Sequence, residues 1–126
     1  MKLGIIGNGH IVKVFLETLR NVEKVESVSI CVRGNSFEKG KELADAFGIK
    51  KVYTDFDSFL LSEEIDTVYV GVINSMHYEY AKKSLLAGKN VICEKPFTKT
   101  FKETEELFDI AKEKGLFLFE NCSLIF

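Results

Sequence analysis

Residues 2–11 read KLGIIGNGHI, and this stretch decides the fold. The apolar run from Lys2 to Ile6 predicts a buried strand, after which Gly7, Asn8 and Gly9 turn the chain sharply. An amphipathic helix is expected next, because apolar residues recur there at helical spacing: Val12, Phe15, Leu16 and Leu19. A strand, a glycine-rich turn and a helix in this order are typical of a βαβ unit around a parallel sheet.

The rest of the chain repeats this alternation. Strands are expected at Lys2–Ile6, Ser27–Val32, Lys51–Tyr53, Thr67–Val70, Asn90–Cys93 and Leu116–Glu120. Further helices are expected around Phe37–Phe47, Phe56–Leu61 and Met76–Ala87, and from Thr100 to Gly115. Gly88 is expected to cap the helix before it, because glycine readily adopts the left-handed conformation that ends helices. The predicted fold class is α/β, with a doubly wound parallel sheet between two layers of helices.

Composition narrows the class of protein. The chain has 126 residues, of which 46% are hydrophobic and 29% charged, so we expect a globular domain in the cytoplasm. Its formal net charge of −2 gives no basic field for nucleic acid, and no apolar run is long enough to span a membrane. Three cysteines without C-x-x-C spacing and only two histidines argue against disulfides and a metal site. The cysteines are expected as small buried hydrophobic residues.

The glycine-rich turn predicts a phosphate-binding site. Helix N-termini offer free N–H groups and partial positive charge to a pyrophosphate, and the helix here starts next to His10 and Ile11. Gly7 would make the tight turn, and Gly9 would let the backbone approach the phosphate. Val12 replaces the third glycine of a G-x-G-x-x-G pattern, which would set the helix slightly farther from the strand. A tight turn without a ligand remains the alternative.

The end of the second predicted strand bears on cofactor choice. It continues as Arg33, Gly34, Asn35 and Ser36, without a carboxylate before Glu38. A site for NAD usually has an acidic residue here, whereas the 2′-phosphate of NADP suits arginine and small polar donors. NADP is therefore favoured over NAD. A solvated arginine, with Ser36 as a helix N-cap, fits the same residues.

Polar residues also follow the fourth and fifth predicted strands. Asn74 could contact a ligand or simply cap the next helix, and His77, in that helix's first turn, is expected as a neutral ring beside the nicotinamide. Glu94 and Lys95 precede a proline, which fixes the direction of the lysine. Lys95 could bind a substrate oxygen and donate a proton, or it could be a surface residue paired with Glu94.

These motifs together resemble the N-terminal domain of the Gfo/Idh/MocA oxidoreductases, over essentially the whole chain. The resemblance rests on GIIGNGHI, on Asn74-x-x-His77, and on AGKNV followed by Glu94-Lys95-Pro96. It implies a Rossmann fold and hydride transfer between NAD(P) and a sugar, a polyol or a related compound. Val12 and Ile73 depart from the family pattern, where a small residue and a proline are common.

The resemblance also implies roles for individual residues. Residues 7–11 would line the pyrophosphate, residues 33–36 the adenosine ribose, and Asn74, His77 and Glu94 the cofactor cleft. Lys95 would be the catalytic residue, placed at the oxygen of the reacting carbon.

The resemblance also implies a second domain that binds substrate, and we expect it to lie beyond these 126 residues. Residues 1–120 are expected to form the dinucleotide-binding domain, and residues 121–126 the start of a crossover toward the missing one. The chain alone should then bind cofactor with little or no turnover, and its apolar end predicts self-association. Two alternatives to the oxidoreductase are a dinucleotide-sensing regulatory module and a methyltransferase-like domain that uses the glycine turn for S-adenosylmethionine. The second would require an acidic residue near Arg33.

Overall fold

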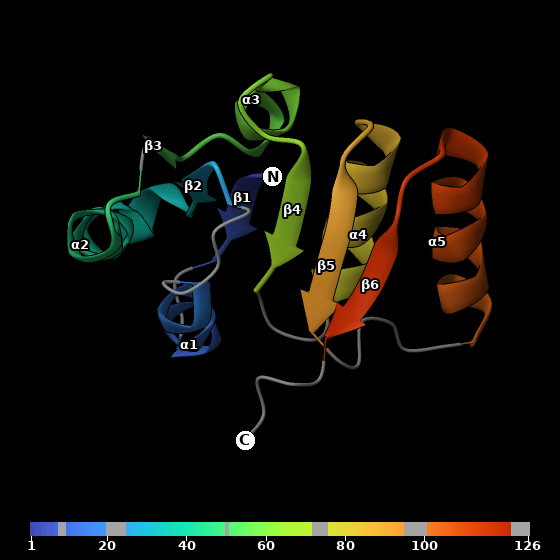
Figure 1. Ribbon diagram of the computed structural model, residues 1–126, viewed down its shortest axis with the longest axis horizontal. Coiled ribbons are helices and arrows are strands. Elements are labelled where there is room, and N and C mark those ends of the chain that lie inside the picture. Colours follow the sequence, from blue (N-terminus) through green and yellow to red (C-terminus); the bar gives the residue numbers. More distant parts are fainter. Residues whose placement is uncertain (8–9, 20–24, 50, 72–75, 95–100, 122–126) are drawn as a thin grey trace.

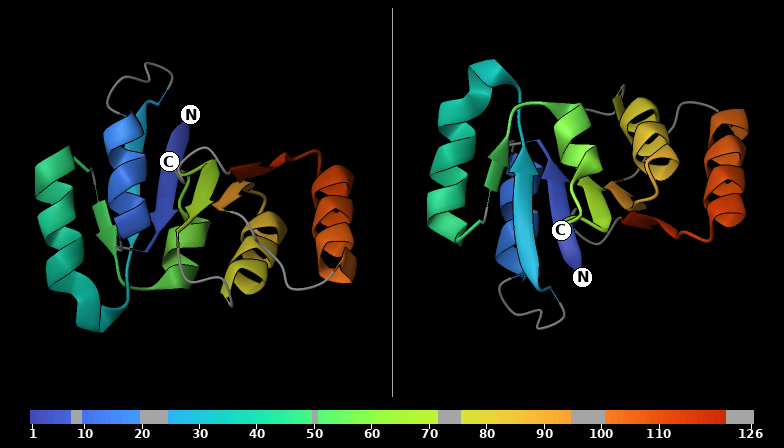
Figure 2. Two further views of the ribbon diagram at one scale, coloured as in Figure 1. Left: turned by 90° about the horizontal axis from the view of Figure 1, so that it is seen from below. Right: turned by 90° about the horizontal axis from the view of Figure 1, so that it is seen from above.

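A computed structural model describes residues 1–7, 10–19, 25–49, 51–71, 76–94 and 101–121 (Figure 1). These residues form one six-stranded sheet with helices on both faces (Figure 2). The predicted doubly wound α/β fold is confirmed.

All neighbouring strands run parallel, in the order β3-β2-β1-β4-β5-β6. Their bounds are β1 (Lys2–Ile6), β2 (Ser27–Cys31), β3 (Lys51–Tyr53), β4 (Thr67–Val70), β5 (Asn90–Glu94) and β6 (Leu118–Asn121). The chain builds outward from β1 to β3, then returns to the other side of β1 with β4. In open sheets of this kind, ligands bind at such a reversal point, outside the carboxyl ends of the strands, which here are those of β1 and β4.

Each of the six predicted strands is present, but four of their ends differ, since β5 runs one residue further, to Glu94, and β6 ends one residue later, at Asn121. β2 stops one residue before Val32, and β6 begins two residues after Leu116. The late start of β6 has a physical cause, because the backbone N–H of Leu116 donates to Ala111 O at 2.8 Å and completes the end of a helix. The N–H of Phe117 donates to the side chain of Asn90 at 3.0 Å.

The helices lie close to their predicted positions. They are α1 (His10–Leu19), a short 3₁₀ turn η1 (Gly34–Ser36), α2 (Phe37–Phe47), α3 (Phe56–Leu61), α4 (His77–Leu86) and α5 (Phe101–Lys114). Gly88 and Gly115 follow α4 and α5 with φ of 84° and 68°, which confirms the expected helix ends. Ser36 stands at the N-cap position of α2, which confirms its predicted position, although its side chain makes no capping hydrogen bond.

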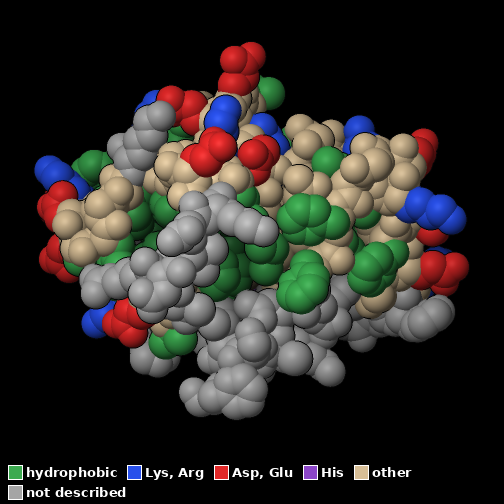
Figure 3. All heavy atoms as spheres, viewed as in Figure 1, with side chains coloured by type: hydrophobic (Ala, Val, Ile, Leu, Met, Phe, Trp, Pro, Cys, Tyr) green, Lys and Arg blue, Asp and Glu red, His purple; other side chains and the backbone are tan. Residues whose placement is uncertain are grey.

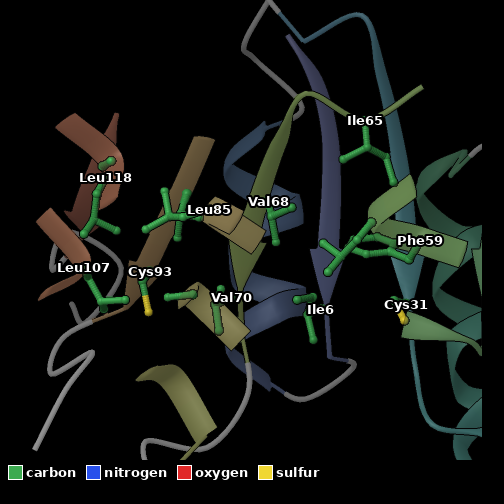
Figure 4. Packing of buried hydrophobic residues seen from close by; sticks show 14 of the residues in the cluster. Ile6, Cys31, Phe59, Ile65, Val68, Val70, Leu85, Cys93, Leu107 and Leu118 are labelled. Atoms are coloured by element: carbon green, nitrogen blue, oxygen red, sulfur yellow. The ribbon is translucent and has the colours of Figure 1, made fainter. Parts of the chain in front are cut away.

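Two apolar cores hold the layers together. One lies between the sheet and α3, α4 and α5, and its buried residues include Ile6, Phe59, Val70 and Leu85 (Figure 4). The other lies on the opposite face, where Leu3, Ile5 and Ile30 pack against α1. β4 is buried on both faces, as expected for a central strand of a parallel sheet.

Apolar side chains are exposed near the β5–β6 end of the sheet. Figure 3 shows hydrophobic groups in that area, and Phe117 and Phe119 are 46% and 58% exposed. Ile92 of β5 and Phe119 of β6 are neighbours in register. None of the described helices has the length and apolar character needed to cross a membrane.

Candidate functional site

The carboxyl ends of β1, β2 and β4 meet at one point of the sheet. Ile6 and Val70, the last residues of β1 and β4, are partners in register. The N–H of Gly7 donates to Cys31 O of β2 at 3.0 Å, and the N–H of Gly71 donates to Ile6 O at 2.9 Å. The residues that follow these three strands are therefore fixed relative to one another by backbone hydrogen bonds.

Gly7 makes the tight turn that the sequence predicted for it. Its φ of 112° is a conformation that residues with side chains rarely adopt, and a Cβ atom there would lie 2.6 Å from Gly71 O. Because its N–H is bonded to Cys31, Gly7 contributes shape and not a phosphate donor. Asn8 and Gly9, the next two predicted site residues, lie outside the described part of the chain.

Donors for a phosphate would come from the start of α1. The helix opens at His10 and Ile11, for which the structure describes only the backbone. Its first turn carries no acidic residue, so no side-chain carboxylate there offsets the positive end of the helix dipole. The tight turn at Gly7, which leaves no room for a side chain, and a helix N-terminus without an acidic residue in its first turn fit a pyrophosphate.

Val12 is fully buried between the helix and the strand ends. Its Cγ2 atom would lie 2.6 Å from a Cβ atom on Gly71 and 3.5 Å from one on Gly7. The valine therefore fits because Gly71 has no side chain. Gly71 was not among the predicted site residues, although a glycine directly after the fourth predicted strand was the available signal.

The segment after β2 is open to solvent near this turn. Arg33, Gly34 and Asn35 are exposed, and Ser36 is half-buried. No atom lies within 4 Å of a Cβ built on Gly34. Arg33 is two residues from Cys31, whose carbonyl accepts the hydrogen bond from Gly7. An exposed segment that carries the positive charge of Arg33 therefore lies next to Gly7.

His77 is the first residue of α4 and is only 1% exposed. Its expected contact with the nicotinamide stays a prediction. Asn74 lies outside the described residues.

Glu94 ends β5 and is paired in register with Asn121 of β6, and its side chain is not among those described. Lys95 follows it immediately but lies outside the described residues. β5 is the neighbour of β4, so the strand that precedes Lys95 ends on the same edge of the sheet as the glycine turn.

Two of the three cysteines are described, and both are buried as predicted. Neither Cys31 nor Cys93 forms a disulfide, and both lie within the apolar core. Burial, and after it the negative charge of Asp55, raises the pKa of Cys31 to about 11. A thiol with this pKa is protonated at neutral pH and is a poor nucleophile. Cys122 lies outside the described residues.

Comparison with known proteins shows which family this fold and glycine turn belong to. Residues 1–122 match a family profile described as an oxidoreductase family with an NAD-binding Rossmann fold. The chain belongs to the Gfo/Idh/MocA family. The resemblance seen in the sequence is confirmed, and NAD(P)-binding is the family's property.

Among relatives of this family, the scyllo-inositol 2-dehydrogenase (NADP(+)) of Bacillus subtilis is 32% identical over 126 residues. The match covers 100% of this chain and 38% of that protein. A trans-1,2-dihydrobenzene-1,2-diol dehydrogenase of Xenopus laevis is also 32% identical, over 94% of this chain and 36% of that protein. The chain thus spans well under half the length of these relatives.

Solved Gfo/Idh/MocA structures have the same fold. A 3-ketoreductase from Actinomadura kijaniata, in complex with NADP and TDP-benzene, superposes with a TM-score of 0.87 at 32% identity. The superposition covers 94% of this chain and 36% of the reductase. GenD2 from gentamicin A biosynthesis, in complex with NAD, gives a TM-score of 0.86 at 27% identity, over 94% of this chain and 33% of GenD2. Proteins with this fold therefore include structures solved with either nicotinamide cofactor.

Proposed function

We propose that this chain is the cofactor-binding part of an NAD(P)-dependent dehydrogenase or reductase. The observation that carries the proposal is the glycine turn at the reversal point of the sheet, where Gly7 has a φ of 112° and lies against the backbone of Gly71. Such a turn brings a ligand's phosphates close to a helix N-terminus. The relatives named above are dehydrogenases and a reductase, which favours an enzyme over a regulatory module.

The proposed cofactor is NADP in preference to NAD. Arg33 is exposed next to the glycine turn, and the first carboxylate after β2 is Glu38, in the first turn of α2. A guanidinium group can bind the 2′-phosphate through two parallel hydrogen bonds and can stack on adenine. NADH lacks that phosphate and would lose the charge-assisted contact. Gly34, Asn35 and Ser36 would supply small groups around the ribose.

Lys95 is the proposed catalytic residue. The bound nicotinamide would supply the hydride to a carbonyl carbon of a sugar or polyol-like substrate, or accept it from the corresponding alcohol. In the reductive direction the Lys95 ammonium would donate a proton to the carbonyl oxygen, giving the alcohol and a neutral amine. In the oxidative direction the amine would take that proton back. Glu94, Asn74 and His77 are proposed to line the cofactor side of this cleft.

The relatives' greater length bears on how the chain would work. We propose that residues 1–120 bind the cofactor and that residues 121–126 lead toward a substrate-binding domain. Substrate groups and part of the proton transfer would then come from that domain. Self-association through the exposed apolar surface of β6 is part of the same proposal.

A titration of the purified chain with NADPH and with NADH tests this function. Nicotinamide fluorescence or calorimetric heat would report binding. We expect NADPH to bind more tightly than NADH, and Arg33→Ala to remove most of that difference. Lys112→Ala is the matched control, because Lys112 is an exposed cation in the last turn of α5.

Two results would contradict the proposal. Failure of both nucleotides to bind at millimolar concentration would refute dinucleotide binding by this part of the molecule. Equal affinity for NADPH and NADH, unchanged by Arg33→Ala, would refute the assigned cofactor preference alone.

A further inference from the structure

Gly71 stands between the glycine turn and the first helix, at a place that the known nucleotide-binding pattern does not include. In G-x-G-x-x-G, the third glycine lets the helix pack closely on the strand. This chain has Val12 at that position, on the inner side of α1. We propose that Gly71, on the neighbouring strand end, supplies the missing space and so positions the phosphate-binding turn. The inference rests on the dinucleotide binding proposed above.

The contacts around Gly71 leave no room for a side chain. A Cβ atom there would lie 2.6 Å from Val12 Cγ2, 3.0 Å from Tyr69 Cε2 and 3.2 Å from Ile6 O. Ordinary contact begins near 3.4 Å, so an added methyl group would have to push Val12 away by roughly 0.8 Å.

Tyr69 cannot relieve this overlap. Its ring is fully buried and stacks on Phe15 of α1, with the ring centroids 3.7 Å apart and the planes 3° from parallel. Movement of Tyr69 would displace Phe15, which belongs to the same helix as Val12. A side chain in place of Gly71 therefore pushes on α1 mainly through Val12, with a smaller push, of a few tenths of an ångström, through Tyr69 and Phe15.

Gly71 also touches the turn directly. Its N–H donates to Ile6 O at 2.9 Å, and its own carbonyl oxygen lies 2.6 Å from the position of a Cβ on Gly7. Gly71 thus lies against Ile6 before the turn, Gly7 in the turn and Val12 in the helix after it. Because phosphate donors must be placed within fractions of an ångström, a shift at Gly71 reaches the atoms that would bind the cofactor.

Gly71 is thus a positioning residue, coupled to Val12. Gly71→Ala should weaken NADPH binding by at least about 10-fold, since displacements of this size impair precisely placed contacts. Val12→Ala removes the Cγ2 methyl group that the new alanine side chain would meet. The double variant Gly71→Ala with Val12→Ala should bind NADPH within about threefold of Val12→Ala alone, which is the non-additive result expected for residues in contact.

Gly4→Ala is the matched control. A Cβ on Gly4 would lie 2.6 Å from Phe59 Cζ, an overlap of the same size, but on the face of the sheet covered by α3. This variant should lower the melting temperature and leave the NADPH dissociation constant within about threefold of wild type. Affinities are measured well below each variant's melting temperature, which separates positioning from stability.

The outcomes distinguish this inference from the proposed function. If the unaltered chain does not bind NADPH, both the proposed function and the role of Gly71 are refuted. If it binds and Gly71→Ala binds equally well, or the double variant is no better than Gly71→Ala, only the role of Gly71 is overturned. Should Gly71→Ala fail to fold, the double variant must still fold and bind like Val12→Ala, and its failure would overturn the inference.

Discussion

Replacing Gly7 by alanine tests the geometry of the turn through stability alone. Alanine at φ 112° would be strained by about 1 to 3 kcal/mol. Its Cβ would also lie 2.6 Å from a backbone oxygen that is fixed by the sheet, an overlap that adds about 1 to 3 kcal/mol. The lower entropy of the unfolded alanine chain returns about 0.4 to 1 kcal/mol. Taken at their midpoints, these contributions predict that Gly7→Ala lowers the free energy of unfolding by about 3 kcal/mol.

Two other glycines separate the contributions. Gly48 has a φ of 66° with no atom within 4 Å of an added Cβ, so Gly48→Ala should cost only about 0.5 to 1 kcal/mol. Gly34 has neither a positive φ nor a close neighbour, so Gly34→Ala should be neutral or stabilise by about 0.5 kcal/mol. Urea unfolding followed by circular dichroism gives all three values. A cost for Gly7→Ala within about 0.5 kcal/mol of that for Gly48→Ala would refute the close contact with Gly71.

Three further predictions concern the body of the domain. Leu85→Ala should destabilise the chain by about 2 to 5 kcal/mol in urea unfolding, because Leu85 is fully buried. The control Leu86→Ala should stay within about 0.5 kcal/mol of wild type, because Leu86 is exposed. Similar values for the two variants would be inconsistent with the core described. Raising the pH from 8 to 10 should lower the free energy of unfolding by about 1 kcal/mol through Cys31. The pKa of this thiol is about 11 in the folded chain and 9.0 in the unfolded chain. Above pH 9 the unfolded chain therefore loses the thiol proton while the folded chain keeps it, and this favours unfolding. Cys31→Ser should lack this loss, and an equal loss in that variant would assign it elsewhere. Lys89→Met should destabilise the chain by about 1 to 3 kcal/mol, because the Lys89 ammonium donates to two backbone carbonyls between α3 and β4, at 2.6 and 2.9 Å. The control Lys112→Met should have no measurable effect on unfolding. Equal effects of the two variants would contradict this role of Lys89.

Much of the fold was predictable from local pattern. Apolar runs bounded by glycine and polar residues located all six strands, because strands buried in a parallel sheet need continuous apolar sequence. The ends of α4 and α5 were predictable as well, since Gly88 and Gly115 adopt a conformation that favours glycine. The start of β6 was not, because the amides just before it bond to the end of α5 and to Asn90, which lies far away in sequence.

The candidate site was predictable only in part. The position of Gly7 followed from its place after the first strand, but the fit of Val12 depends on a contact with Gly71, fifty-nine residues along the chain. Spacing within one motif cannot reveal such a partner. His77 shows the same limit, since its burial depends on how α4 packs against the rest of the molecule and not on its place in the helix's first turn.

A backbone amide NMR titration of the isotope-labelled chain with NADPH tests the central claim most directly. We predict that the shifted amide signals belong to the carboxyl edge of the sheet: Gly7, Val12, Gly71 and the segment from Arg33 to Ser36. Signals at the opposite edge, such as those of Lys89 and Gly115, should stay in place. Saturating shifts at the opposite edge, or no shifts at all, would contradict the account.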